Sequence, residues 1–151
     1  MRIVLLLALA AMAPVLMGSA GRVMELPEHW LAEFRDTTCE YETRGKTAAD
    51  RIDAIGGAKE AGYCQVKKTS AKDAGFITTN RELLTKDINF AASLAVLNFC
   101  ATKHKTQSLH RVAYCYNGGP WARYRSYKSS AWGYANEVKR LHDWRMANGN
   151  D

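Results

Sequence analysis

The sequence predicts one compact, mostly α-helical domain with a small loop or β-hairpin near its middle. With 151 residues, 47% hydrophobic and 24% charged, the chain has the size and composition of a single globular domain. Apolar residues recur at helical spacing in several segments. Glycine and alanine gather in one stretch between the first two of these segments. We find no internal repeat, linker or second domain.

The first twenty residues differ from the rest of the chain. Arg2 precedes an apolar run from Ile3 to Met17, and small residues follow at 18–20. This pattern is typical of an export signal that ends at a cleavage site. An uncleaved anchor is the alternative, but the run is shorter than the roughly 20 residues that a membrane span needs. We expect residues 1–20 to be removed, leaving a periplasmic or secreted protein without a stable membrane anchor.

Helical spacing predicts the first helix. Pro27 fits a first helical position, and Trp30, Phe34 and Tyr41 recur at helical intervals until Gly45. Glu42 then lies at the C-terminal end of this helix. Residues 46–66 are rich in glycine and alanine, and their turn points at Gly56-Gly57 and Gly62 favour a loop or small hairpin over a helix. Such a segment can form one wall of a cleft. A short helix is expected over 69–74.

The second half of the chain predicts three further helical features. Residues 87–103 are apolar on two sides, typical of a central buried helix, with Ile88, Ala91, Ala95 and Phe99 on one side and Phe90, Leu94 and Leu97 on the other. Ser108 is a candidate N-cap for a helix that ends at 117–120. Ser129 or Ser130 caps the last helix. Its predicted stripe is Ala131, Tyr134, Val138 and Leu141, and residues 148–151 are expected to fray.

The chain is basic, with a formal net charge of +6. A basic exported protein meets cell-wall glycans, anionic lipids and nucleic acid, and the charge alone selects none of these. One basic cluster, Lys67, Lys68 and Lys72, falls near the predicted helix at 69–74. Another interleaves with aromatic residues, as in polysaccharide- or nucleic-acid-binding strips; it comprises Trp121, Arg123, Tyr124, Arg125, Tyr127 and Lys128. A solvated loop is the alternative.

Four cysteines in a chain expected to be exported predict two disulfides with three possible pairings. Spacing does not decide among the pairings. A bridge between Cys100 and Cys115, each near the end of a predicted helix, would leave Cys39 with Cys64. A zinc site is disfavoured, because no Cys-x-x-Cys pair occurs and the histidines lack ligand spacing. Nothing local marks a cysteine as an activated thiolate for Cys/His catalysis.

Four short segments, taken in order, resemble the lytic transglycosylase and goose-type lysozyme family. They are Glu42-Thr43, Gly62-Tyr63-Cys64-Gln65, residues 113–119 and Tyr134. The family reads Glu-Ser, Gly-Leu-Met-Gln, Ala-Tyr-Asn-Ala-Gly and a late Tyr. Residues 65–75 also match the family's Gln-Ile-Met-Pro-Ala-Thr-Ala-Arg-Glu-Leu-Gly without a gap, although Lys68 replaces the Pro. The resemblance extends from about residue 30 to 141 and implies a lysozyme-like catalytic domain over 21–147.

By this resemblance Glu42 is the catalytic acid. Glu40 is its nearest rival, but two residues along a helix turn the side chain by roughly 200°, so both cannot point into one cleft. Burial against apolar walls would raise the Glu42 pKa, as an acid that works near neutral pH requires. The implied substrate-binding residues are Thr43, Gln65, Tyr116, Asn117 and Tyr134. Singly, Tyr116 and Tyr134 also fit core positions, Asn117 a helix cap and Gln65 the surface.

The expected reaction is cleavage of the MurNAc–GlcNAc β-1,4 bond of peptidoglycan. In the transglycosylase branch one Glu suffices, the products carry 1,6-anhydromuramic ends, and no metal or cofactor is required. A hydrolytic lysozyme is the first alternative, and Asp50 or Asp53 would then hold a water. A non-catalytic glycan-binding or assembly protein is the second. The expected partners are glycan strands, and a secretion or wall-spanning apparatus is also compatible; nucleic acid is not expected.

Overall fold

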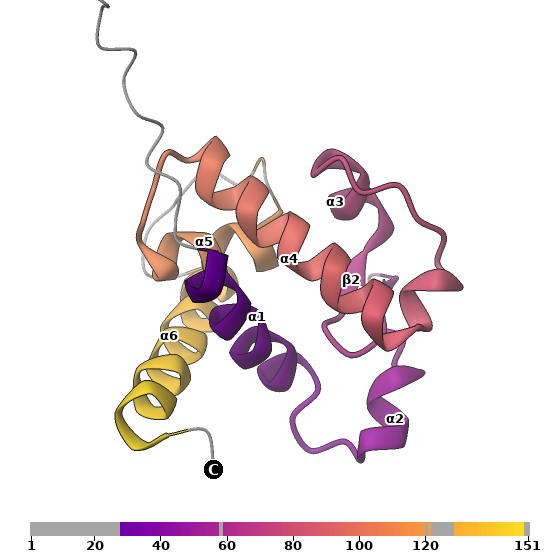
Figure 1. Ribbon diagram of the computed structural model, residues 1–151, viewed down its shortest axis with the longest axis horizontal. Coiled ribbons are helices and arrows are strands. Elements are labelled where there is room, and N and C mark those ends of the chain that lie inside the picture. The colour runs from indigo at the N-terminus through magenta and orange to yellow at the C-terminus, as the bar shows by residue number, and fades with distance from the viewer. Residues whose placement is uncertain (1–27, 58, 120, 122–128, 150–151) are drawn as a thin grey trace, which may run out of the picture.

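The computed structural model describes residues 28–57, 59–119, 121 and 129–149 (Figure 1). This part of the chain is mostly helical, which confirms the predicted class. Its helical elements are α1 (Glu28–Glu42), α2 (Ala48–Ile52), α3 (Lys68–Asp73), the 3-10 helix η1 (Glu82–Leu84), α4 (Lys86–Lys103), α5 (Leu109–Gly118) and α6 (Ser130–Asn148). The predicted signal at 1–20, Pro27 and the basic aromatic residues at 123–128 lie outside the described residues.

The predicted small hairpin is confirmed. Strands β1 (Glu60–Ala61) and β2 (Val66–Lys67) pair antiparallel, with Glu60 opposite Lys67 and Ala61 opposite Val66. Gly62 begins the turn at φ +74°, and a Cβ there would lie 2.2 Å from the Leu83 carbonyl oxygen. Glycine is therefore required at this position, both for the left-handed backbone and for the close approach of η1.

The short helix α2 corrects the prediction of a loop or hairpin throughout 46–66. The Thr47 side chain caps this helix by accepting from the Asp50 backbone N–H at 3.2 Å, and Thr47 Oγ1 also contacts the Asp50 carboxylate. The Thr47 hydroxyl thereby satisfies one of the otherwise free N–H groups at the start of the helix. Thr47 and Asp50 are a local signal for the start of a helix. The prediction of a loop did not take this signal into account.

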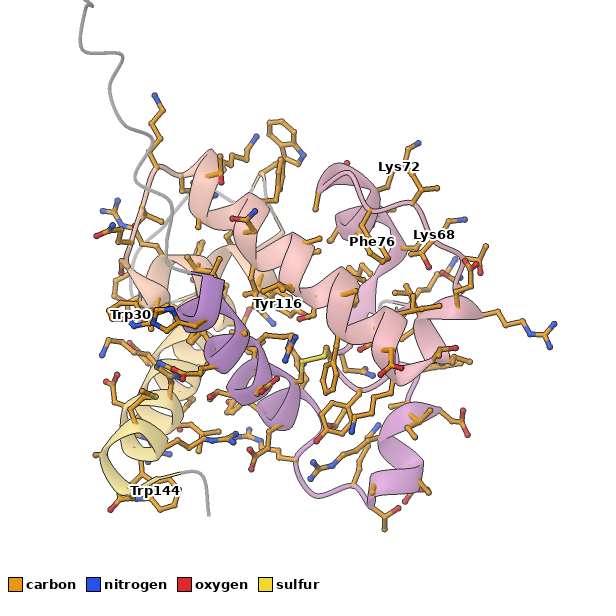
Figure 2. All side chains as sticks on the ribbon, viewed as in Figure 1. Trp30, Lys68, Lys72, Phe76, Tyr116 and Trp144 are labelled. Carbon is orange, nitrogen blue, oxygen red and sulfur yellow. A yellow bond between two sulfur atoms is a disulfide. The ribbon has the colours of Figure 1, made fainter. Side chains whose placement is uncertain are left out.

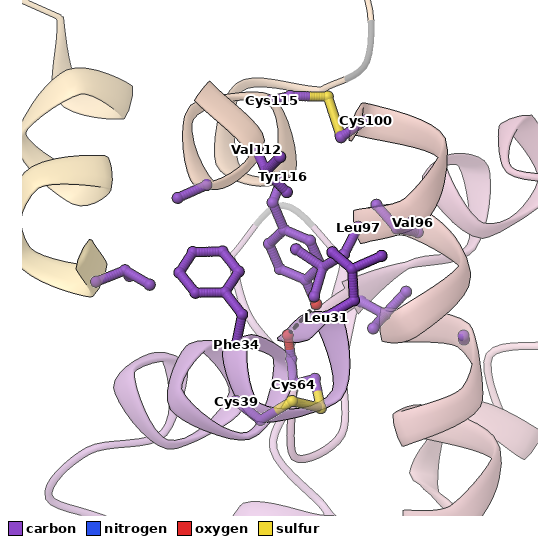
Figure 3. Packing of buried hydrophobic residues seen from close by; sticks show 14 of the residues in the cluster. Leu31, Phe34, Cys39, Cys64, Val96, Leu97, Cys100, Val112, Cys115 and Tyr116 are labelled. Carbon is purple, nitrogen blue, oxygen red and sulfur yellow. Dashed lines mark hydrogen bonds between the residues drawn. A yellow bond between two sulfur atoms is a disulfide. The ribbon is translucent and has the colours of Figure 1, made fainter. Parts of the chain in front are cut away.

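Helix α4 lies at the centre of the fold and packs against α1, α3, α5, η1 and β2. Figure 1 shows α1, α5 and α6 gathered at one side of α4, while α2, α3 and the hairpin lie at the other. The main core forms where α1, α4 and α5 meet, and it includes Leu31, Phe34, Leu97 and Val112 (Figure 3). The central place predicted for the helix over 87–103 is confirmed.

The buried face of α4 differs from the predicted one. Its buried residues are Asn89, Ala92, Ser93, Val96, Leu97, Cys100 and Ala101, whereas Ala91 is exposed and Ile88, Ala95 and Phe99 are half-buried. The Asn89 amide donates to the carbonyls of Ala61 at 2.8 Å and Leu83 at 2.7 Å. Its carbonyl oxygen accepts from the Cys64 N–H at 2.6 Å. Leu97 of the predicted second side is buried, and Phe90 and Leu94 pack against the core. The polar residues Asn89 and Ser93 share the buried row because their groups find partners, and apolar periodicity did not predict this.

The last two helices begin where the sequence indicates. Ser108 caps α5, and Ser129, rather than Ser130, caps α6 by accepting from the Trp132 N–H at 3.2 Å. The buried stripe of α6 is Ala131, Ala135, Val138 and His142, while the predicted Tyr134 and Leu141 are half-buried. Helix α6 includes Asn148, so the regular structure extends one residue into the predicted tail.

All four cysteines are paired, as Cys39–Cys64 and Cys100–Cys115. The first bridge joins α1 to the hairpin turn, and the second joins α4 to α5. Disulfides persist in oxidising compartments, so the two bridges are compatible with an exported protein. Within the described ranges, no helix has both the length and the apolar character needed to span a bilayer.

Candidate functional site

A cleft of about 210 Å³ opens where five elements converge: the end of α1, the hairpin, α3, α4 and α5. Its lining residues are Glu42, Glu60, Gln65, Val66, Lys67, Ser70, Val96, Tyr116 and Asn117. Four of the six predicted site residues are among them, namely Glu42, Gln65, Tyr116 and Asn117. The fold therefore brings together residues that are up to 75 positions apart in the sequence.

Glu42 is the last residue of α1, and its side chain is half-buried. Burial raises the pKa of this carboxyl from 4.5 to about 7, and the neighbouring Glu60 carboxylate acts in the same direction. Tyr134, Lys67 and Arg44 each oppose the rise. A carboxyl with this pKa is a mixture of acid and carboxylate near neutral pH, which suits a group that must both give and take a proton.

Glu40 points away from the cleft. Its carboxylate is bound by the guanidinium of Arg145 on α6, and Glu40 is not among the cleft-lining residues. The two glutamates therefore occupy different faces of α1, as their spacing on a helix predicts. Of the two, only Glu42 is positioned to meet a bound ligand.

Tyr116 lines the cleft and also holds two of its walls together. Its buried hydroxyl donates to the Cys64 carbonyl at 2.8 Å and contacts Ser93 Oγ at 3.1 Å. Figure 3 shows the ring reaching from α5 toward the Cys39–Cys64 bridge. Burial raises the Tyr116 pKa far above its usual range, so the hydroxyl stays neutral and remains a hydrogen-bond donor.

Gln65 lines the cleft, but its amide group binds the hairpin. With φ at 49°, it directs Nε2 to the carbonyls of Ala54 at 3.1 Å and Gly62 at 2.8 Å. Both amide hydrogens are thereby used within the cleft wall. A ligand in the cleft meets the remaining surface of this side chain.

Thr43 lies beneath the cleft surface. Its side chain is fully buried, and its hydroxyl donates to the Cys39 carbonyl at 3.0 Å. This bond ties the residue after α1 back to the last turn of that helix. The structure therefore does not bring Thr43 to the cleft with the other predicted residues.

Tyr134 reaches Glu42 from α6. Its ring packs edge-to-face on Tyr41, with 5.3 Å between ring centroids. The buried hydroxyl has no hydrogen-bond partner of regular geometry among the described residues, yet it lies close enough to the Glu42 carboxyl to lower that group's pKa. Burial raises the Tyr134 pKa well above its usual range. Tyr134 is not among the cleft-lining residues, so it lies beside Glu42 without reaching the cleft surface where it was predicted to bind substrate.

Sequence reasoning missed Glu60, Ser70 and Val96 as cleft residues, and it placed Lys67 near a helix instead of in strand β2. Lys67 Nζ lies 3.2 Å from a Glu60 carboxylate oxygen, across the hairpin. Glu60 and Lys67 lie at equal sequence distances before and after the turn at 62–65. This spacing of two opposite charges is the signal from which the ion pair could have been predicted. Figure 2 shows the other predicted basic residues, Lys68 and Lys72, pointing outward from α3.

Asp50 and Asp53 do not lie in this cleft. They line a separate, shallow hollow together with Gly45, Lys46, Ala49, Ala54 and Ile55. Both aspartates are exposed. The arrangement around Glu42 therefore offers a second carboxylate from β1, which is Glu60, and not from the segment that follows Gly45.

Within the described ranges, no cluster of three or more His, Cys, Asp or Glu side chains gathers in a form that could hold a metal ion. The chemistry that the cleft residues themselves offer is proton transfer by Glu42, beside hydrogen-bonding groups and one ion pair. Comparisons of this chain with protein-family models, curated proteins and solved structures found no match.

Proposed function

We propose that this protein is an exported, lysozyme-like enzyme that cleaves the MurNAc–GlcNAc β-1,4 bond of peptidoglycan without water. Glu42 is the general acid and then the general base. The observation that carries the proposal is the Glu42 carboxyl itself, which lines an open polar cleft and has its pKa raised by burial to about 7. Residues implied by the family resemblance, Gln65, Tyr116 and Asn117, share the same cleft.

The reaction begins with proton transfer. The Glu42 hydroxyl protonates the glycosidic oxygen as the bond from that oxygen to the anomeric carbon breaks. The acetamido oxygen of the muramic residue forms a bond to the anomeric carbon and stabilises it. The 6-hydroxyl oxygen of the same sugar then displaces the acetamido oxygen and closes the 1,6-anhydro ring, while its proton returns to Glu42. Glu42 supplies one proton in the first step and takes one back in the second. The proposed reaction therefore needs neither a metal nor a cofactor.

The surroundings of Glu42 support both halves of this cycle. Burial disfavours the carboxylate that forms when the proton leaves, which makes Glu42 a strong enough base to take the second proton. Tyr116 and Asn117, near the C-terminal end of α5, also line the cleft. The two disulfides and the basic net charge of +6 are compatible with work on a cell-wall polymer outside the cytoplasm.

Hydrolysis is a second candidate outcome, because the cleft contains another carboxyl, Glu60. Paired carboxyl groups are the usual equipment of glycosidases that use water. Mass spectrometry of the products released from purified peptidoglycan separates the outcomes. Anhydromuramic ends are expected from the proposed reaction, and reducing ends would indicate hydrolysis. No release of glycan fragments by the folded protein would contradict both and leave glycan binding as the remaining function.

A further inference from the structure

The cleft holds two carboxyl groups in different surroundings. Glu42 ends α1 and is half-buried without an ion-pair partner among the described residues, since neither Lys67 nor Arg44 comes within salt-bridge distance of it. Glu60 lies on β1 and is 22% exposed, and its carboxylate is paired with Lys67 at 3.2 Å. The pairing favours the charged form of Glu60. Of two neighbouring carboxyls, the one without a paired cation is then the one that keeps the proton.

Three features hold the Glu60 carboxylate in place. The β1–β2 register sets Glu60 directly opposite Lys67. The Glu60 carbonyl accepts from the Gly56 N–H at 2.8 Å, which fixes the backbone. A Cβ at position 56 would lie 2.5 Å from Glu60 Oε2 and 2.7 Å from Gln65 Oε1. Gly56 thus leaves room for the Glu60 carboxylate, and a larger residue there would displace the carboxylate from the cleft wall.

The charged and titratable groups that act on the Glu42 carboxyl lie on the hairpin, just after α1, and on α5 and α6. They are Glu60 on β1, Lys67 on β2, Arg44 just after α1, Tyr116 on α5 and Tyr134 on α6. The two tyrosines stay neutral in the accessible pH range, since burial raises the pKa of each. Glu60 is therefore the one negative charge in this set, and Lys67 directly contacts it.

We propose that Glu60 and Lys67 are positioning residues for the reaction: Glu60 holds the proton on Glu42, and Lys67 fixes the Glu60 carboxylate in the cleft wall beside Gly56. This inference rests on the proposed function and deepens it. When Glu42 gives up its proton to the glycosidic oxygen, two carboxylates face one another. Their repulsion favours return of a proton to Glu42, so Glu60 promotes the second step as well as the first.

The test compares pH profiles of glycan release from purified sacculi for wild type, Glu60→Gln and Lys67→Met. Removing the Glu60 charge should move the alkaline limb of the profile down by about one pH unit, because Glu42 then loses its proton more easily. Lys67→Met should move the alkaline limb to higher pH, because the Lys67 charge lowers the Glu42 pKa. Glu40→Gln, which alters an ion-paired carboxyl outside the cleft, is the matched control and should leave the profile unchanged.

An alkaline limb that stays in place in Glu60→Gln would overturn the proposal. So would a loss of activity at every pH without a shift, since Glu60 would then act on substrate or water directly. Should Glu60→Gln fail to fold, Gly56→Ala decides instead: its Cβ would displace the Glu60 carboxylate, so its alkaline limb should also move down, and an unmoved limb refutes the proposal. Carboxyl ¹³C NMR titration without substrate compares the Glu42 pKa itself in wild type and the same variants. A shift there in a protein that releases no glycan would uphold the electrostatic coupling while refuting the proposed function.

Discussion

The Tyr116 hydroxyl donates a hydrogen bond to the Cys64 carbonyl at 2.8 Å, and this bond joins helix α5 to the hairpin turn across the base of the cleft. Cys64 is itself bonded to Cys39 on α1, the helix that ends at Glu42. One tyrosine and one disulfide thus connect three of the elements that surround the candidate catalytic carboxyl.

Tyr116→Phe should weaken this connection while keeping the ring. The change leaves the buried Cys64 carbonyl without the tyrosine donor and removes the contact with Ser93. We expect a loss of about 1–3 kcal/mol in the free energy of unfolding. Activity on sacculi should also fall at temperatures where the variant stays folded. Urea unfolding and a turnover assay check both. Ser93→Ala, which keeps the Cys64 bond, is the control, and equal effects of the two variants would contradict this role.

The two disulfides should both stabilise the fold but differ in their effect on activity. Each closes a loop, of 25 residues for Cys39–Cys64 and 15 for Cys100–Cys115. Replacing either pair with alanine should destabilise the protein by about 3 kcal/mol. Only the Cys39/Cys64 variant should lose activity in the folded state, because that bridge holds the hairpin against the Glu42 helix.

Thiol titration of the denatured, unreduced wild type should find no free thiol. A count near four would show that neither bridge forms in solution. If the Cys100/Cys115 variant lost as much activity as the Cys39/Cys64 variant, at matched fractions folded, the special role of the bridge beside the cleft would be refuted.

Stability should depend on pH through Glu42. Its pKa is about 7 in the folded protein and 4.5 ordinarily, so between these values the folded state binds more protons than the unfolded state. The free energy of unfolding therefore decreases as the pH rises from about 4.5 to about 7, by at most about 3 kcal/mol. Glu42→Gln removes this dependence. It should be more stable than wild type at pH 8 and comparable at pH 4, as chemical unfolding at both pH values would show. An equal difference at both pH values would argue against the raised pKa.

Asn117 should affect binding without affecting the fold. It is exposed at the end of α5 and lines the cleft. Asn117→Ala is expected to change the free energy of unfolding by less than about 0.5 kcal/mol, as surface substitutions do. KM for soluble glycan fragments should rise, because a hydrogen-bonding side chain at the cleft is lost. An unchanged KM would exclude Asn117 from the ligand-binding surface.

Local signals in the sequence predicted much of the fold. The N-cap at Ser108, the helical spacing of the predicted helices and the small hairpin were confirmed. The opposite orientations of Glu40 and Glu42 followed from helix geometry alone. These features depend on residues close together in the sequence, where helix and turn rules act directly.

What could not be predicted depends on partners distant in the sequence. The buried face of α4 carries Asn89 and Ser93, whose hydrogen bonds reach Cys64 and Tyr116. The pattern of apolar residues in the sequence gives no information about such hydrogen-bonded pairs. Glu60 enters the cleft because the hairpin register places it opposite Lys67, and a shift of one residue would turn it away. Thr43 is an exception, because its hydroxyl bonds to the Cys39 carbonyl only four residues earlier, a contact that threonine commonly makes in helices.

The activities of Glu42→Gln and Glu40→Gln on purified sacculi, measured side by side, test whether Glu42 is the catalytic acid. Gln keeps the shape of Glu but cannot transfer the proton. We expect Glu42→Gln to lower glycan release by about 10²- to 10⁴-fold while folding and glycan binding remain intact. Glu40→Gln, which alters only the contact with Arg145, should retain most of its activity. A fully active Glu42→Gln, or an inactive but folded Glu40→Gln, would contradict the assignment of the catalytic acid.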